Sequence, residues 1–347
     1  MFSQSYWLNR LSGLVPSWKG KDNDVFERGR VRYISLFAGI GGFDLALNRL
    51  GHTCVWANEW DKYAAQIYEK NFSYQGGGEQ PRKEREYEQG YVYTKSGGEK
   101  AHIDTRDIRT VPTSEIPDHD LLVGGFPCQA FSIAGKRRGF DDTRGTLFFE
   151  IARILKDKQP KLFILENVKG LLSHDGGNTF KIIISTLDEL GYDLQWQVVN
   201  SKNFGVPQNR ERVFIVGHLR GTSRPKVFPF GGEGKKSIKQ LELVGNCNPS
   251  GRGQSGGVYS VDGLHPTIGA GGGNPNRKRD IGWSSGYIRQ HTLKSSNVSI
   301  RRLTPTECER LQGFPDGWTE GISDTQRYKC LGNAVTVNVV YEIAKRL

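Results

Sequence analysis

The stretch "VGGFPCQAFS" places a single cysteine, Cys128, where a thiol could act as a nucleophile. An apolar run, "DLLVGG", ends just before it, a Phe-Pro pair turns the chain, and Lys136, Arg137 and Arg138 follow between glycines. A reactive thiol needs a polar, electropositive loop of this kind, because the thiolate is the attacking species. An inert cysteine buried beside a turn is the alternative that this stretch alone leaves open.

Two further motifs hold polar groups that such a nucleophile needs. In "LENV", Glu166 stands at the end of another apolar run, and "PQNRERVFIVG" places Gln208, Arg210 and Arg212 at the start of the next. Side chains alternate along a strand, so Arg210 and Arg212 share one face. We expect one of these arginines to pair with Glu166 and to bind a carbonyl oxygen of a substrate. A purely structural ion pair is the alternative.

A third group of residues predicts a cofactor that contains adenosine. In "SLFAGIGGFDLAL", Gly39, Gly41 and Gly42 stand between an expected strand and an expected helix, where a ligand can approach the backbone. About 20 residues later, Glu59 and Trp60 end the next strand; a carboxylate there can bind both ribose hydroxyls, and an aromatic ring beside it can cover adenine. A tight structural turn, with a solvated acid and a core tryptophan, is the alternative.

The elements that must position these residues alternate along the chain. Apolar runs that read as strands stand at 31–37, 53–58, 120–125 and 161–166, and helical patterns follow at 42–51, 60–71, 144–158 and 178–191. We expect Asn178 to cap the last of these helices and Gly191 to end it. The pattern predicts an α/β fold with a doubly wound, mostly parallel sheet and a second, smaller, loop-rich domain.

Composition divides the chain further. We expect an N-terminal extension at 1–30, a catalytic and cofactor-binding domain at 31–217, and a return to regular structure at 301–347, where Thr304, Pro305 and Glu307 form a capping box. Residues 73–103 lack Leu, Phe and Trp and predict a mobile surface insertion. Residues 218–300 hold 16 glycines and 12 Lys/Arg against four acids, within a chain of net charge +11. This excess favours a polyanionic partner, nucleic acid first; a merely solvated basic surface is the alternative.

Other classes of protein are excluded by what the sequence lacks. The five cysteines are scattered and form no CxxC pair, which argues against a disulfide framework and against a metal site. No apolar run approaches the roughly 20 residues that span a bilayer, and the N-terminus does not read as a signal peptide. We therefore expect a cytoplasmic protein with free thiols and no membrane partner.

Seven motifs, in one order, resemble those of the cytosine-5 DNA methyltransferases, and most closely the bacterial restriction-modification enzymes. They are "FAGIGG", "NEWDKYA", "GFPCQAFS", "LENVKG", "PQNRERV", "RRLTPTECERLQGFP" and "LGNAVTVN". The resemblance covers Ile34 to Ala344, apart from the insertion at 73–103. It implies a Rossmann-like methyltransferase fold, S-adenosylmethionine as cofactor, double-stranded DNA as partner, a monomer, and a cognate restriction endonuclease.

The resemblance also assigns residues. The implied catalytic set is Cys128, Glu166 and Arg212, with Arg210 in support. The implied cofactor contacts are Phe37, Gly39, Gly41, Glu59, Trp60, Asp107, Ile108, Pro127, Leu147 and Asn333, although Arg106 stands where the family often has glycine. The implied DNA contacts are Ser132, Lys136, Arg137, Arg138 and Thr267.

In the implied reaction, Cys128 adds to carbon 6 of a cytosine flipped out of the duplex, Glu166 interacts with ring nitrogen 3, and Arg212 holds the ring oxygen. The loop at 132–142 would close over the flipped base, and the basic segment 218–300 would read the DNA sequence. Two alternatives remain at this stage: a tRNA cytosine-5 methyltransferase, and a non-catalytic DNA-binding regulator with the same fold.

Overall fold

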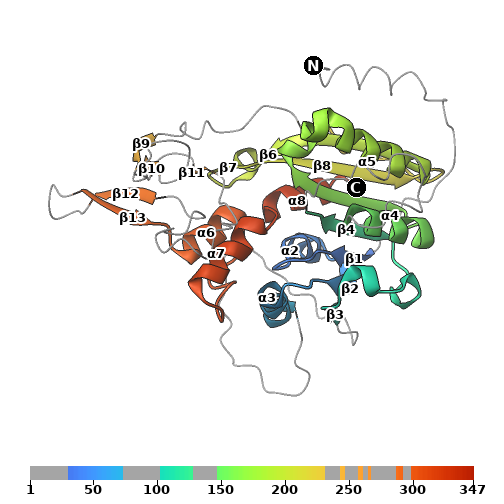
Figure 1. Cartoon of the computed structure of the whole chain (residues 1–347), viewed down its shortest axis with the longest axis horizontal. Helices are drawn as coiled ribbons and strands as arrows, with labels where there is room; N and C mark the ends of the chain where they lie inside the picture. Colours follow the sequence, from blue (N-terminus) through green and yellow to red (C-terminus); the bar gives the residue numbers. More distant parts are fainter. Residues whose placement is uncertain are drawn as a thin grey trace.

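The computed structural model describes residues 30–72, 102–127, 147–230 and 302–347, and the backbone of 243–246, 257–260, 265–266, 287–291 and 298–301. Its centre is a seven-stranded sheet with the order β3-β2-β1-β4-β5-β8-β6 (Figure 1). The strands are β1 (Arg32–Leu36), β2 (Thr53–Asn58), β3 (His102–Asp104), β4 (Leu121–Gly125), β5 (Leu162–Val168), β6 (Tyr192–Asn200) and β8 (Glu211–Leu219). The neighbouring strands β3, β2, β1, β4 and β5 are parallel to one another, and β8 runs antiparallel to both β5 and β6.

Apolar residues cover both faces of the sheet, which explains why its strands read as near-continuous apolar runs. Along β1, Tyr33 belongs to one buried cluster and Ile34 to the other, as the alternation of side chains requires. One face packs against α2 (Gly42–Arg49) and α3 (Lys62–Phe72), and the other against α4 (Leu147–Lys158) and α5 (Asn178–Glu189). The predicted doubly wound, mostly parallel fold is confirmed.

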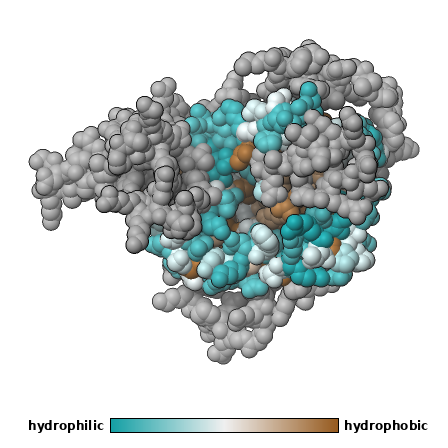
Figure 2. Space-filling model, viewed as in Figure 1, coloured by the Kyte–Doolittle hydropathy of each residue, from teal (hydrophilic) through white to brown (hydrophobic). Residues whose placement is uncertain are grey.

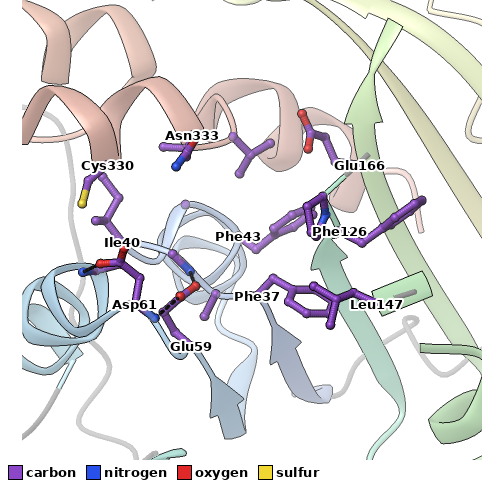
Figure 3. Close-up of a pocket in the computed structure, with 18 of the residues that line it drawn as sticks. Phe37, Ile40, Phe43, Glu59, Asp61, Phe126, Leu147, Glu166, Cys330 and Asn333 are labelled. Atoms are coloured by element: carbon purple, nitrogen blue, oxygen red, sulfur yellow. Dashed lines mark hydrogen bonds between the residues drawn. The ribbon is translucent and has the colours of Figure 1, made fainter. Parts of the chain in front are cut away.

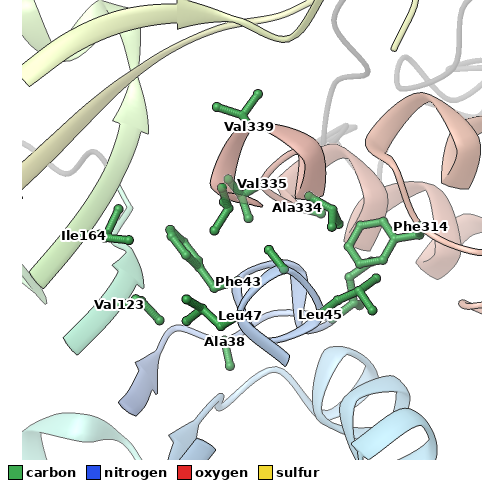
Figure 4. Close-up of a cluster of buried hydrophobic side chains, with 14 of the residues drawn as sticks. Ala38, Phe43, Leu45, Leu47, Val123, Ile164, Phe314, Ala334, Val335 and Val339 are labelled. Carbon is green, nitrogen blue, oxygen red and sulfur yellow. The ribbon is translucent and has the colours of Figure 1, made fainter. Parts of the chain in front are cut away.

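The end of the chain returns to α2, the first helix of the described residues. α6 (Pro305–Gln312) begins with the predicted capping box at Thr304, and α7 (Asp324–Asn333) and α8 (Val337–Ala344) follow. Figure 4 shows Phe43 and Leu47 of α2 between sheet residues and the C-terminal Val335 and Val339. Burying such side chains contributes about 1.5–3 kcal/mol each, so the C-terminal helices are part of the core.

Residues beyond β8 stay on the sheet before a second sheet forms. The expected boundary at 217/218 falls inside β8, because this strand ends at Leu219. Beyond it, Val227 is fully buried in the core of the same domain. β9 (Leu243–Asn246), β10 (Gly257–Ser260), β12 (Tyr287–His291) and β13 (Val298–Arg302) form a four-stranded sheet. β11 (His265–Pro266) pairs in parallel with β7 (Gln208–Asn209), directly before the arginines of "RER".

Two predictions about local structure are wrong. Asn178 does not cap α5: the N-cap is Gly177 in a left-handed conformation, and Asn178 is the first helical residue, with its amide donating to Asp175. The insertion does not extend to residue 103, because His102 and Ile103 form β3 beside β2. Ile103 is buried in the core, and that burial outweighs the polar composition of the residues before it.

The surface of the described part is mostly polar, with apolar residues gathered near the centre of the face in Figure 2. Within residues 30–72, 102–127, 147–230 and 302–347, no helix is long and apolar enough to cross a bilayer. The same residues contain no cluster of three His, Cys, Asp or Glu side chains that could hold a metal ion.

We predict that His218 makes the stability of the fold depend on pH. His218 lies buried in β8, and neither ring nitrogen has a hydrogen-bond partner among the described residues. Burial, helped by the charge of Arg224, lowers the pKa of His218 from 6.5 to about 4. Between these values the unfolded chain binds a proton that the folded protein excludes, so acidification from pH 6.5 to 4 lowers the free energy of unfolding by about 3 kcal/mol.

Urea unfolding of the parent and of His218→Leu at pH 7, 5.5 and 4.5 measures this contribution. The variant should lose less stability than the parent on acidification. Equal losses would contradict the assignment, since His52 and His119, whose pKa values burial also lowers, are present in both proteins.

Candidate active site

A cavity of about 570 Å³ opens at the carboxyl ends of β1, β2, β4 and β5, the edge at which parallel α/β sheets bind ligands. The turn after β1 forms one side of it, and α7 with the residues that follow forms another. Figure 3 shows Glu59 and Asp61 on one wall, Cys330 and Asn333 on the C-terminal helix above them, and Glu166 across the cavity on β5. Groups from the first 61 residues and from the last 20 therefore line one cavity.

Glu59 is held at one end of this cavity by two backbone donors. The N–H of Gly39 donates to Oε2 and the N–H of Asp61 donates to Oε1, both at 2.8 Å. Burial raises the pKa of Glu59, while these two hydrogen bonds act in the opposite direction. Trp60 beside it is 71% exposed, unlike the core tryptophan that was the alternative. A fixed carboxylate next to an open aromatic face suits the ribose and adenine of an adenosyl group.

Most of the predicted cofactor residues line the cavity: Phe37, Gly39, Glu59, Trp60, Asp107, Ile108, Pro127, Leu147 and Asn333. Gly41 is not among the lining residues. It is the left-handed N-cap of α2, and a Cβ there would lie 2.1 Å from Cε2 of Phe72. Close packing of the turn on α3 therefore requires glycine at this position.

Glu166 and Arg212 form an ion pair at the other end of the cavity. Nε of Arg212 lies 3.0 Å from Oε1 of Glu166, and both side chains are largely buried. Burial raises the pKa of Glu166, and the guanidinium groups of Arg212 and Arg210 oppose that shift. A carboxyl in this setting can bind a ring nitrogen that carries a proton. Of the two arginines expected to pair with Glu166, Arg212 is the one that forms the ion pair.

Arg210 is placed for a different role. Its side chain is 1% exposed, and Nη2 donates to the carbonyl oxygens of Gly332 at 3.0 Å and Ala334 at 2.8 Å. These carbonyls flank Asn333, so Arg210 ties the strand that carries Arg212 to the C-terminal wall of the cavity. Burial, together with Arg212, lowers the pKa of Arg210. Arg210 also lines the cavity, so its contacts through Nη2 join that lining to the C-terminal backbone.

Asp107 lines the cavity as part of an ion pair with Arg109. Its carboxylate accepts from Nε of Arg109 at 3.0 Å, and both residues line the cavity. Arg106, which replaces the glycine frequent in the family, binds the carboxylates of Asp104 and Glu115 instead of the cavity. The polar wall near Ile108 is thus formed by Asp107 and Arg109, and the sequence motifs did not single out Arg109.

Several predicted residues lie outside the described part of the chain: Cys128, Ser132, Lys136, Arg137, Arg138 and Thr267. Pro127, which precedes Cys128 in the sequence, lines the cavity. The polar lining residues that the sequence reasoning did not assign to the site are Asn58, Asp61, Arg109, Asn167, Lys329 and Cys330. Asp61 lies within the motif "NEWDKYA", and Lys329 stands two residues before "LGNAVTVN". Only their ion pair shows that the two residues act together.

The cavity of this Rossmann-like sheet has a carboxylate suited to an adenosyl group at one end and a buried carboxyl–guanidinium pair at the other. This arrangement defines the class of cofactor-dependent group-transfer enzymes. The family model of the C-5 cytosine-specific DNA methylases matches residues 31–246 and 230–347, and the chain belongs to this family. The predicted resemblance is therefore confirmed. The enzyme is a DNA (cytosine-5)-methyltransferase with S-adenosylmethionine as cofactor and DNA as substrate.

Relatives span nearly the whole chain. The Type II methyltransferase M.HhaI of Haemophilus parahaemolyticus is 37% identical, over 90% of this chain and 93% of the relative. The Type II methyltransferase M.HpaII of Haemophilus parainfluenzae is 38% identical, over 92% and 90%. Among solved structures, the S. pombe Dnmt2 methyltransferase matches with a TM-score of 0.63 and 20% identity, over 91% of this chain and 97% of that one, which shows the shared fold.

We predict that Gly125→Ala impairs catalysis without unfolding the protein. Gly125 pairs with Glu166 across β4 and β5, and a Cβ at this position would lie 3.1 Å from Oε2 of Glu166. Displacing a reacting group by a fraction of an ångström should lower kcat by about 10- to 100-fold.

Tritium transfer from labelled S-adenosylmethionine to DNA measures kcat, and thermal unfolding checks the fold. Gly170→Ala is the matched control, because its Cβ would meet only Cγ2 of Val168, at 4.0 Å. Equal activities of the two variants would show that Glu166 tolerates crowding from β4.

Proposed function

We propose that this protein transfers a methyl group to carbon 5 of a flipped-out cytosine in a specific short duplex sequence, through a covalent adduct of Cys128. The observation that supports this most strongly is the shared cavity, which has Glu59 at one end and the Glu166–Arg212 ion pair at the other. The two ends offer one site for the cofactor and one for the target base, so donor and acceptor would meet between them.

The residues present fit the cofactor. Glu59 would bind the ribose hydroxyls, Trp60 would stack on the adenine, and Phe37, Leu147 and Asn333 would enclose the remainder. Phe37 itself adopts a left-handed backbone conformation, with φ at 54°, a strained geometry of the kind found at ligand sites. When bound, S-adenosylmethionine supplies an electrophilic methyl group on a sulfonium.

The protein's part in the reaction is to make carbon 5 nucleophilic. The thiolate of Cys128 adds to carbon 6, and the electron pair of the 5,6 double bond becomes available at carbon 5. Glu166 would hold a proton at ring nitrogen 3 and Arg212 would hold the ring oxygen, which stabilises the negative charge as it develops. After methylation, loss of the carbon 5 proton expels the thiolate and restores the aromatic ring.

Recognition of DNA is assigned to the basic segment and to the loop after Cys128. Removing a base from the stack requires a few kcal/mol, which contacts elsewhere on the duplex must supply. Ser132, Lys136, Arg137 and Arg138 would contact the DNA around the flipped base, and Thr267 would do so from the segment 218–300. The pairing of β11 with β7 supports this, since it brings residues 265–266 beside the strand that leads to Arg212.

The biological setting follows from the relatives, which are named Type II methyltransferases. We propose that the enzyme acts as a monomer in the bacterial cytoplasm, at the nucleoid, and protects host DNA from a cognate restriction endonuclease. Methylation-sensitive sequencing of DNA from cells that express the protein would identify the methylated sequence.

Trapping of a covalent adduct tests the mechanism. With duplex DNA that contains 5-fluorocytosine at the target, the wild-type enzyme should form an adduct that survives denaturing electrophoresis, because fluorine cannot leave as a cation. Cys128→Ala should form none, and Glu166→Gln should form it about 100-fold more slowly, since charge stabilisation is lost. Adduct formation by Cys128→Ala at the wild-type rate would overturn the assignment of the nucleophile.

A further inference from the structure

We propose that Lys329 is a positioning residue for the cofactor, which acts through Asp61 to hold Glu59 in the orientation that binds ribose. This inference rests on the proposed role of Glu59. Lys329 stands at the opposite end of the sequence from the acid it serves, and both residues line the same cavity.

A continuous series of contacts joins the two residues. Nζ of Lys329 lies 2.7 Å from Oδ2 of Asp61, and Oδ1 of Asp61 accepts from the backbone N–H groups of Tyr63 and Ala64 at the start of α3. The backbone N–H of Asp61 donates in turn to Oε1 of Glu59 at 2.8 Å. The lysine thus fixes the residue whose N–H holds one of the two carboxylate oxygens of Glu59.

The ion pair also joins two walls of the cavity. Asp61 follows β2, whereas Lys329 lies in α7, directly before Cys330 and four residues before Asn333. Figure 3 shows Asp61 on one wall of the cavity and Cys330 and Asn333 on the other. Side chains on one helix move together, so a lysine bound to Asp61 places Asn333 relative to Glu59. This coupling would align two cofactor contacts that come from opposite ends of the chain.

The charge of Lys329 matters as well as its reach. Burial raises the pKa of Glu59, the nearby carboxylate of Asp61 raises it further, and Lys329 lowers it. Other titratable groups on the surrounding elements are Cys330 on α7, and Asp104 on β3, which is bound by Arg106. Without the ammonium, the Coulombic repulsion between Asp61 and Glu59 would no longer be offset, and Glu59 would take up a proton at higher pH.

The ion pair is suited to positioning because it adds little to global stability. The side chains of Lys329 and Asp61 are 45% and 27% exposed, and partly exposed ion pairs contribute little to folding. A defect in cofactor binding can therefore be separated from a defect in folding.

Calorimetric binding of S-adenosylhomocysteine to the full-length enzyme, at pH 6.5 and 8.5, tests the proposal. Lys329→Met should raise Kd about 10-fold at pH 6.5 and less at pH 8.5, because a higher pH favours the ionised form of Glu59, and Lys329→Arg should stay within about twofold of wild type. Lys70→Met is the matched control: Lys70 also joins α3 to the C-terminal region, through the carbonyls of Gly317 and Glu320, but does not line the cavity.

Glu59→Gln and the double variant with Lys329→Met complete the experiment. If Lys329 acts through Glu59, the double variant should bind no more weakly than Glu59→Gln, because interacting residues are not additive. Additive losses, or a loss with Lys329→Met that is the same at both pH values, would overturn the inference and leave the proposed function intact. Unchanged binding by Glu59→Gln would instead reject the ribose role of Glu59 itself.

Discussion

Two buried carboxylates at one edge of a parallel sheet are the constraint on which the rest of the site depends. Glu59 and Glu166 both emerge where strands end, and both lose hydration there, which raises their pKa values. A buried carboxylate is tolerated only where donors replace water. Backbone N–H groups serve Glu59 and the guanidinium of Arg212 serves Glu166, so the loops and strands around the cavity must deliver those donors.

The C-terminal residues complete what the sheet begins. α2 carries apolar side chains on the face that the sheet does not cover, and α8 packs against them, so α2 holds α8 in place. The same return brings the carbonyls of Gly332 and Ala334 to Arg210 and brings Lys329 to Asp61. Packing of the core and assembly of the site therefore depend on the same C-terminal helices. A substitution that disturbs this packing would also displace residues that line the cavity.

Much of the fold and site could be predicted because local patterns are strong here. The apolar runs, the capping box at Thr304 and the glycine turn after β1 each depend on neighbours in sequence, and the structure confirms them. Predictions were wrong where distant packing decided: the buried side chain of Ile103 forms a strand at the end of a polar stretch, and a left-handed Gly177 precedes α5 in place of an Asn178 cap. Gly41 serves the packing of Phe72, a contact that no local pattern reveals.

The sequence by itself determined the chemistry: which strands end in a carboxyl, which motif carries the thiol, and that the family is that of the cytosine-5 methyltransferases. Only the tertiary structure decided how the two arginines of "RER" divide their roles, with Arg212 on Glu166 and Arg210 on the C-terminal backbone. It also decided that Lys329 reaches Asp61. The physical reason is that hydrogen bonds and ion pairs are short-ranged and directional, so a pairing between residues far apart in the sequence exists only once the sheet and its helices have packed.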